Sequence, residues 1–106
     1  MYPLGYDPPV FQVLQTDVFA KWLSQLRDAR AKARIVARVD AVRRGHFGDV
    51  KQLGGGVAEM RIDVGAGYRL YFVRRQSAVV ILLCGGDKST QDKDIVRARK
   101  MATEIG

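Results

Sequence analysis

The spacing of apolar residues divides this chain into a helical first half and a strand-rich second half. Before the first helix, the short apolar run 10–14 favours a strand, because β-branched and aromatic residues prefer extended backbone. Apolar residues then recur three and four positions apart, at Phe19, Trp22, Leu23 and Leu26, which is the spacing of one helix face. Thr16 or Asp17 is expected to cap this helix, since a short oxygen side chain accepts from free N–H groups of the first turn.

A second helical stretch carries apolar residues at Ala33, Val36 and Val39 and stops at Gly45. Residues 28–30 are the expected bend between the two helical stretches. No proline interrupts residues 19–44, so one continuous helix is an alternative, but two antiparallel helices suit a small domain better.

After Gly45 the glycines multiply and the spacing becomes two, which is typical of strands. A short strand is predicted at residues 50–53. Longer strands are predicted at 60–64 and 68–72, on either side of a turn at 65–67 whose glycines tolerate positive φ.

A three-residue turn would pair Ile62 with Leu70 and Arg61 with Tyr71, and all apolar residues would share one face. A two-residue turn would split that face, so the pattern favours the longer turn. The polar face of this predicted hairpin carries Arg61, Asp63, Arg69 and Tyr71.

The run 78–84 is apolar throughout, which indicates an interior strand covered on both faces. A short basic helical segment is predicted at 95–105. Clustered helices followed by clustered strands predict an α+β fold rather than alternating α/β units. The length of 106 residues suits one domain, 1–106, in which the proline-rich residues 1–9 form an irregular lead-in.

Charge and cysteine content narrow the class of protein. Lys and Arg number 18 against 11 Asp and Glu, and a net charge of +7 suggests a polyanionic or acidic partner. The single Cys84 excludes an internal disulfide and fits a reducing compartment, so we expect a cytoplasmic protein. One histidine, His46, and one cysteine are too few for a typical structural zinc site. Neither a membrane span nor a signal peptide is visible.

The positive charge is concentrated in two places. Eight cations and two acids lie between Lys21 and Arg44. This basic stretch could bind a phosphate backbone, bind an acidic partner, or simply face solvent. A second cluster, Arg61 and Arg69, lies on the polar face of the hairpin, and Lys51 and Lys88 are expected near it. A solvated sheet face is the alternative interpretation of that cluster.

Five short stretches carry a family resemblance. They are 19–23 (FAKWL), 48–51 (GDVK), 59–62 (EMRI), 67–72 (GYRLYF) and 83–89 (LCGGDKS). Each stretch alone is weak, but their order and spacing over 11–102 are specific. In this combination the chain resembles the RelE/ParE family of type II toxins, in particular the HigB-like addiction module killer proteins.

The resemblance implies a fold, a partner and an activity. The fold is a small twisted antiparallel sheet with two N-terminal helices on one face and a short C-terminal helix. The partner is an antitoxin with a helix-turn-helix domain, expected to be acidic where it covers the basic groove or pairs with the sheet edge. RelE-like members cut mRNA in the ribosomal A site, and ParE-like members poison DNA gyrase. We therefore expect a ribosome-dependent mRNA endoribonuclease without cofactor or metal; a gyrase inhibitor and a nucleic-acid-binding module are the alternatives.

The resemblance also implies roles for single residues. Arg69 looks like the family arginine that stabilises charge on the phosphate, Arg61 like a basic residue of the preceding strand, and Lys88 falls near the basic residue after the last strand. Fixed cations lower the barrier because the pentacovalent phosphorane gains negative charge. The acid and base stay open, since the C-terminal tyrosine or histidine of better-known members is absent and Glu59 replaces a lysine. Candidates for acid and base are Asp87, Asp94, Glu59, Lys51 and Lys88. Expected RNA or ribosome contacts are Lys51, Tyr71, Gln91, Arg30, Arg34, Arg38, Arg43 and Arg44.

Overall fold

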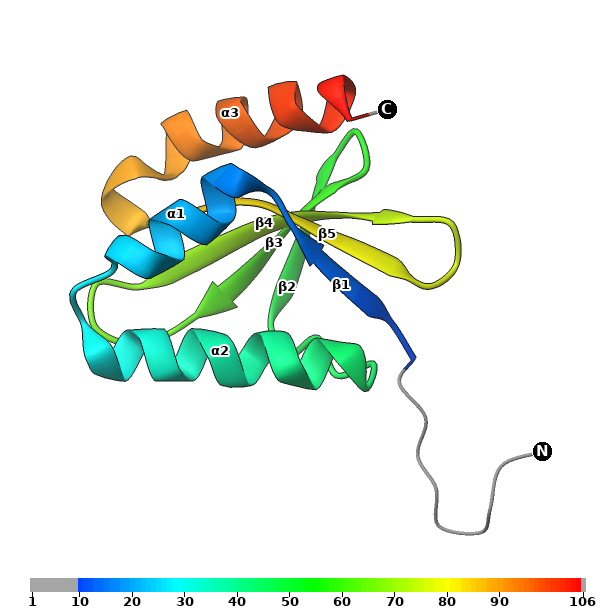
Figure 1. Cartoon of the computed structure of the whole chain (residues 1–106). Helices are drawn as coiled ribbons and strands as arrows, with labels where there is room; N and C mark the ends of the chain where they lie inside the picture. The colour runs from blue at the N-terminus through cyan, green and yellow to red at the C-terminus, as the bar shows by residue number, and fades with distance from the viewer. Residues whose placement is uncertain (1–9, 106) are drawn as a thin grey trace, which may run out of the picture.

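The order of helices and strands matches the expectation from residue spacing throughout residues 10–105, the part of the chain that the computed structural model describes (Figure 1). The elements are β1 (Gln12–Gln15), α1 (Asp17–Gln25), α2 (Ala29–Arg43), β2 (Val50–Gly54), β3 (Val57–Ile62), β4 (Tyr68–Arg75), β5 (Val79–Asp87), the 3-10 turn η1 (Lys88–Thr90) and α3 (Gln91–Glu104). The expected lead-in, residues 1–9, lies outside the described residues. Among the helices of residues 10–105, none has the length and apolar character that a membrane span needs.

The strands form one sheet in the order β1-β5-β4-β3-β2. Neighbouring strands from β2 to β5 are antiparallel, whereas β1 runs parallel to β5, with Gln12 opposite Val79. The α+β fold class is confirmed, and the sheet is mixed rather than wholly antiparallel. No hairpin joins β1 to β5, so the local pattern of neither run indicates their relative direction. The interior position predicted for the apolar run 78–84 is also confirmed, because β5 lies between β1 and β4.

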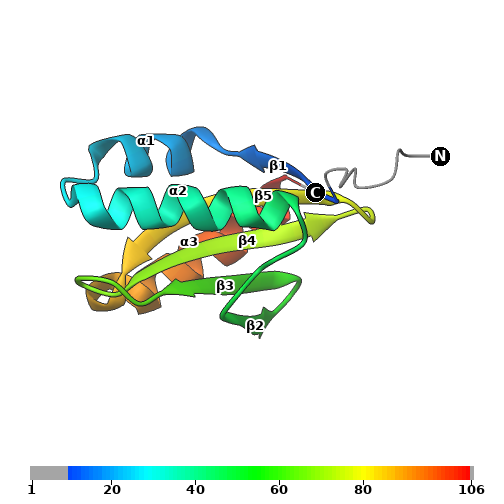
Figure 2. The same ribbon diagram turned by 90° about the horizontal axis from the view of Figure 1, so that it is seen from below.

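Helices cover both faces of the sheet, which buries two separate apolar clusters. The larger cluster packs α1 and α2 against one face and includes Phe19, Ile35, Met60 and Leu70. The smaller cluster packs α3 against the other face and includes Ala98. Figure 2 shows α2 in front of the sheet and α3 behind it. Alternate residues of β3 and β4 therefore point toward α2 or toward α3.

Side-chain caps fix where α1 and α2 begin. The Thr16 hydroxyl accepts a hydrogen bond from the backbone N–H of Phe19 (3.1 Å) and donates to the carbonyl of Leu83 on β5 (2.6 Å). Asp28 caps α2 by accepting from the N–H of Ala31 (3.0 Å). The expected break between two helices is confirmed. The bend is shorter than the predicted 28–30, because Asp28 caps α2 and the helix already begins at Ala29.

The register of the β3–β4 hairpin differs by two residues from the prediction. Ile62 pairs with Tyr68 and Arg61 pairs with Arg69, so residues 63–67 form a five-residue loop. Within the loop the N–H of Gly67 donates to the carbonyl of Val64 (3.0 Å), which closes the turn before pairing begins. Because the shift is even, the division into an apolar and a polar face is unchanged. The consequence is that the two arginines of the polar face lie directly opposite each other.

Candidate functional site

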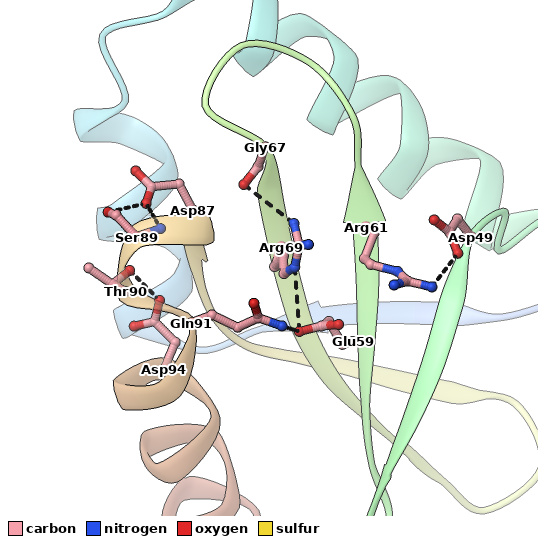
Figure 3. A network of polar contacts seen from close by, with 10 residues as sticks. All are labelled: Asp49, Glu59, Arg61, Gly67, Arg69, Asp87, Ser89, Thr90, Gln91 and Asp94. Atoms are coloured by element: carbon pink, nitrogen blue, oxygen red, sulfur yellow. Dashed lines mark hydrogen bonds and ion pairs between the residues drawn. The ribbon is translucent and has the colours of Figure 1, made fainter.

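Three cations from separate elements line one pocket on the face of the sheet that α3 partly covers. Arg61 comes from β3, Arg69 from β4, and Lys88 follows β5 directly. Figure 3 shows the two arginines side by side on neighbouring strands. The pocket has a volume of about 200 Å³ and is also lined by Asp49, Ile62 and Asp63. The predicted convergence of the three cations is therefore present in the structure.

A counter-charge balances each of the paired arginines. Nη2 of Arg61 lies 3.0 Å from Oδ1 of Asp49, and Nε of Arg69 lies 3.6 Å from Oε1 of Glu59. The first pair is open to solvent, since the side chains of Arg61 and Asp49 are 38% and 61% exposed. The second pair is enclosed, since the side chains of Arg69 and Glu59 are 12% and 1% exposed. Two like charges directly opposite on adjacent strands repel, and the two carboxylates offset that repulsion.

Lys88 reaches the pocket because a glycine lies beneath it. Its backbone N–H donates to the carbonyl of Gly67 (2.9 Å), which joins the end of β5 to the turn before β4. A Cβ on Gly67 would lie 2.6 Å from Cε and 3.0 Å from Cδ of Lys88. Gly67 also has φ +78, a conformation that side chains disfavour. Both observations explain glycine at this position.

Asp87 and Asp94, two of the predicted acid or base candidates, form hydrogen bonds at the start of α3. The carboxylate of Asp87 accepts from the backbone N–H (2.8 Å) and the hydroxyl of Ser89. These hydrogen bonds lower the pKa of Asp87, so it stays ionised at neutral pH. Asp94 accepts from the hydroxyl of Thr90 (2.6 Å) and lies against Gly86 of β5. Neither aspartate is among the residues that line the pocket, and both organise the first turns of α3.

Three expected RNA contacts turn inward instead. Tyr71 is fully buried, because α3 covers this part of the polar face, and burial with the nearby Glu59 carboxylate raises the pKa of its hydroxyl. Gln91 donates from Nε2 to Oε1 of Glu59 (2.9 Å). Arg38 donates to the carbonyls of Arg61 (2.8 Å) and Phe47 (2.7 Å). The prediction of an RNA contact is wrong for Tyr71, which has no exposed surface, whereas Gln91 and Arg38 are half-buried and hydrogen-bonded within the protein.

Arg38 has a structural role that bears on the pocket. Burial of its guanidinium lowers the pKa of Arg38 from its usual value. Its two hydrogen bonds tie the end of β3, at Arg61, to the loop that leads into β2. That loop carries Asp49, whose carbonyl accepts from the N–H of Arg61 (2.9 Å). Arg38 therefore holds the backbone from which the Arg61–Asp49 pair projects.

Other basic residues of the predicted RNA surface remain on the outside of the molecule. Arg30 and Arg34 are exposed on α2, and Lys51 is exposed on β2, outside the pocket. Arg43 and Arg44 are also exposed, and each pairs with Asp40, at 3.8 Å and 2.9 Å.

Sequence reasoning missed two carboxylates of the pocket, Asp49 and Asp63. Asp63 belongs to the predicted polar face of the hairpin, so the pattern alone could have indicated it. Asp49 required the register between β2 and β3, which no pattern of alternation gives.

Metal-binding groups and the Cys84 thiol were the other candidates for chemistry in residues 10–105. This part of the chain holds no group of three or more His, Cys, Asp or Glu side chains that could bind a metal ion. Burial raises the pKa of the Cys84 thiol to about 11, which makes it a poor nucleophile. The arrangement of guanidinium, ammonium and carboxylate groups instead suits anion binding and proton transfer.

Fold and pocket together define a small basic α+β protein with three cations around one pocket. The sequence model of the family described as phage derived protein Gp49-like (DUF891) matches residues 21–103, and the chain belongs to this family. The family is a toxin-like family of addiction modules. An "Uncharacterized protein" of Haemophilus influenzae (strain ATCC 51907 / DSM 11121 / KW20 / Rd) is 52% identical over 95 residues, which cover 90% of this chain and 96% of that protein.

Proposed function

We propose that this protein is the toxin of a type II toxin–antitoxin pair and an endoribonuclease that cuts mRNA on the ribosome. One observation carries the proposal: Arg61, Arg69 and Lys88 line a single pocket open to solvent. Such a group of fixed cations suits a phosphodiester, because guanidinium and ammonium groups donate charge-assisted hydrogen bonds to phosphate oxygens. Membership of a toxin-like family supports the same conclusion.

The reaction is attack of the ribose 2′-oxygen on the adjacent phosphorus. The O2′–P bond forms, the P–O5′ bond breaks, and the products carry a 2′,3′-cyclic phosphate and a free 5′-hydroxyl. The intermediate phosphorane carries more negative charge than the substrate. Arg61, Arg69 and Lys88 stabilise that charge with donors that are already in place before the reaction.

Proton transfer falls to the groups of the same pocket. Asp49 accepts the 2′-hydroxyl proton, because its carboxylate lines the pocket, is 61% exposed and is oriented by Arg61. The ammonium of Lys88 donates a proton to the leaving 5′-oxygen. Glu59 is too deeply buried for either task.

Partner binding uses other surfaces. The exposed arginines of α2, among them Arg30 and Arg34, contact ribosomal RNA in the cytoplasm. The cognate antitoxin, a helix-turn-helix protein, presents an acidic segment to this basic surface or pairs with an edge strand, β1 or β2.

Purified translation with mapping of mRNA 5′ ends tests the proposal. Addition of the wild-type protein is expected to produce new 5′-hydroxyl ends within the translated region, and omission of ribosomes should abolish them. A parallel assay follows supercoiling by DNA gyrase. Intact mRNA together with stalled gyrase–DNA complexes would contradict the nuclease proposal and support gyrase inhibition. Salt-dependent RNA binding without cleavage or growth arrest would reduce the protein to a binding module.

A further inference from the structure

Glu59 is a charged side chain in an unusual place. Among residues 10–105 it is the one buried charged residue, on the side of β3 that α3 covers. Burial of a carboxylate costs several kcal/mol unless a counter-charge and hydrogen bonds compensate. The contacts of the Glu59 carboxylate therefore indicate its role.

Oε1 of Glu59 joins two elements. It accepts a hydrogen bond from Nε2 of Gln91, the first residue of α3 (2.9 Å), and lies 3.6 Å from Nε of Arg69 on β4 (Figure 3). Oε2 of Glu59 and the hydroxyl of Tyr71 are both enclosed, and the two groups are neighbours, since the Glu59 carboxylate helps to raise the pKa of that hydroxyl. The carboxylate thus faces Gln91, Arg69 and Tyr71.

Arg69 has few other constraints. Nη1 donates to the carbonyl of Gly67 at 3.5 Å, the outer limit of a hydrogen bond. Its side chain is only 12% exposed, and it lines the pocket. By contrast, Arg61 is held by an exposed pair with Asp49. Two contacts of similar length therefore orient the Arg69 side chain, the Gly67 carbonyl at 3.5 Å and the Glu59 carboxylate at 3.6 Å, and of these only Glu59 carries a charge.

We propose that Glu59 is a positioning residue that fixes the Arg69 guanidinium at the pocket, and that Gln91 in turn fixes Glu59. The first turn of α3 is then part of the site although none of its side chains lines the pocket. The catalytic consequence rests on the proposed ribonuclease function, whereas the fixed geometry of Arg69 does not. A donor that is already oriented stabilises a transition state without reorganisation during the reaction, which is the benefit of this arrangement.

Glu59→Gln tests the proposal because it keeps the shape of the side chain and removes its charge. Glu104→Gln, the same change at an exposed residue near the end of α3, is the matched control. Hydrogen exchange of the Arg69 Nε–H, followed by NMR, is expected to be slow in the wild type and in the control. It should approach the rate of an exposed arginine in Glu59→Gln and increase by a smaller factor in Gln91→Ala.

Kinetics add a second readout. For mRNA cleavage, kcat of Glu59→Gln should fall by about 100-fold, the effect expected for a misplaced catalytic group, while KM changes little. Should Glu59→Gln fail to fold, Gln91→Ala at the half-buried start of α3 supplies the same two measurements.

The two proposals can fail separately. Unchanged protection of the Arg69 Nε–H in Glu59→Gln or, if that variant does not fold, in Gln91→Ala would overturn the positioning role, whatever the activity. A wild-type protein that cleaves no RNA would overturn the nuclease function, and the exchange measurement would still decide the role of Glu59. A fall in kcat accompanied by an equal rise in KM would also contradict the proposal, because it indicates lost substrate binding.

Discussion

Replacement of Arg69 by alanine is expected to destabilise the fold by about 3–5 kcal/mol, the usual cost of removing one partner from a buried ion pair. The variant leaves the Glu59 carboxylate enclosed without its counter-charge, since Glu59 is 1% exposed. A small domain has a total stability of about 5–15 kcal/mol, so the loss is a large fraction. Urea unfolding followed by circular dichroism measures it directly.

Arg61→Ala is the matched control for this prediction. It also removes an arginine from the pocket, but both members of the Arg61–Asp49 pair are more than a third exposed. Solvent screens such a pair, and we expect a change of less than about 1 kcal/mol. Equal losses in the two variants would contradict the difference in burial. The practical consequence is that lost activity in Arg69→Ala would not by itself demonstrate a catalytic role.

Lys88→Ala should lower kcat for mRNA cleavage by about 10²–10³-fold, the range observed when one transition-state donor is removed. The side chain is exposed and its stem lies over Gly67, so the free energy of unfolding should change little. Initial rates in purified translation with saturating mRNA measure the effect. A variant that cleaves at the wild-type rate would remove Lys88 from the mechanism.

A pair of glycine variants controls for indirect effects at Lys88. Gly67 and Gly55 have φ +78 and +63, so alanine strains the backbone by about 1–2 kcal/mol at either position. Only at Gly67 would the new Cβ displace the stem of Lys88, because open space surrounds Gly55. We expect similar losses of stability and a loss of cleavage in Gly67→Ala alone. An equal loss of cleavage in the alanine variants of Gly67 and Gly55 would show that backbone strain, not displacement of Lys88, causes the loss.

The sequence predicts those features that depend on neighbours along the chain. The spacing of Phe19 and Trp22 indicates α1, and the hydroxyl of Thr16 indicates its start. Alternation in β3 and β4 assigns Arg61 and Arg69 to one face, since a period of two is intrinsic to a strand. The family resemblance adds Lys88, and the pocket brings these three residues together.

Features that depend on tertiary packing could not be predicted in this way. Alternation places Tyr71 on a polar face but contains no information that α3 will cover that face. Gln91 and Arg38 are polar residues whose partners are distant in sequence, Glu59 in the first case and the carbonyls of Arg61 and Phe47 in the second. Exposure is therefore the natural interpretation of all three. Tyr71 is instead fully buried, and Gln91 and Arg38 are half-buried by contacts that the sequence does not reveal.

Binding of an uncleavable RNA tests the central claim most directly. A short RNA with 2′-O-methyl groups cannot undergo attack by O2′, and the Nε–H signals of the arginines report where it binds by NMR. The signals of Arg61 and Arg69 are expected to shift together with one Kd. Arg75 lies at the other end of β4, where it donates to the carbonyl of Ala102 on α3, and its signal should not shift. Saturable binding that shifts Arg30 and Arg34 on α2 but leaves Arg61 and Arg69 unmoved would contradict a phosphodiester site in this pocket.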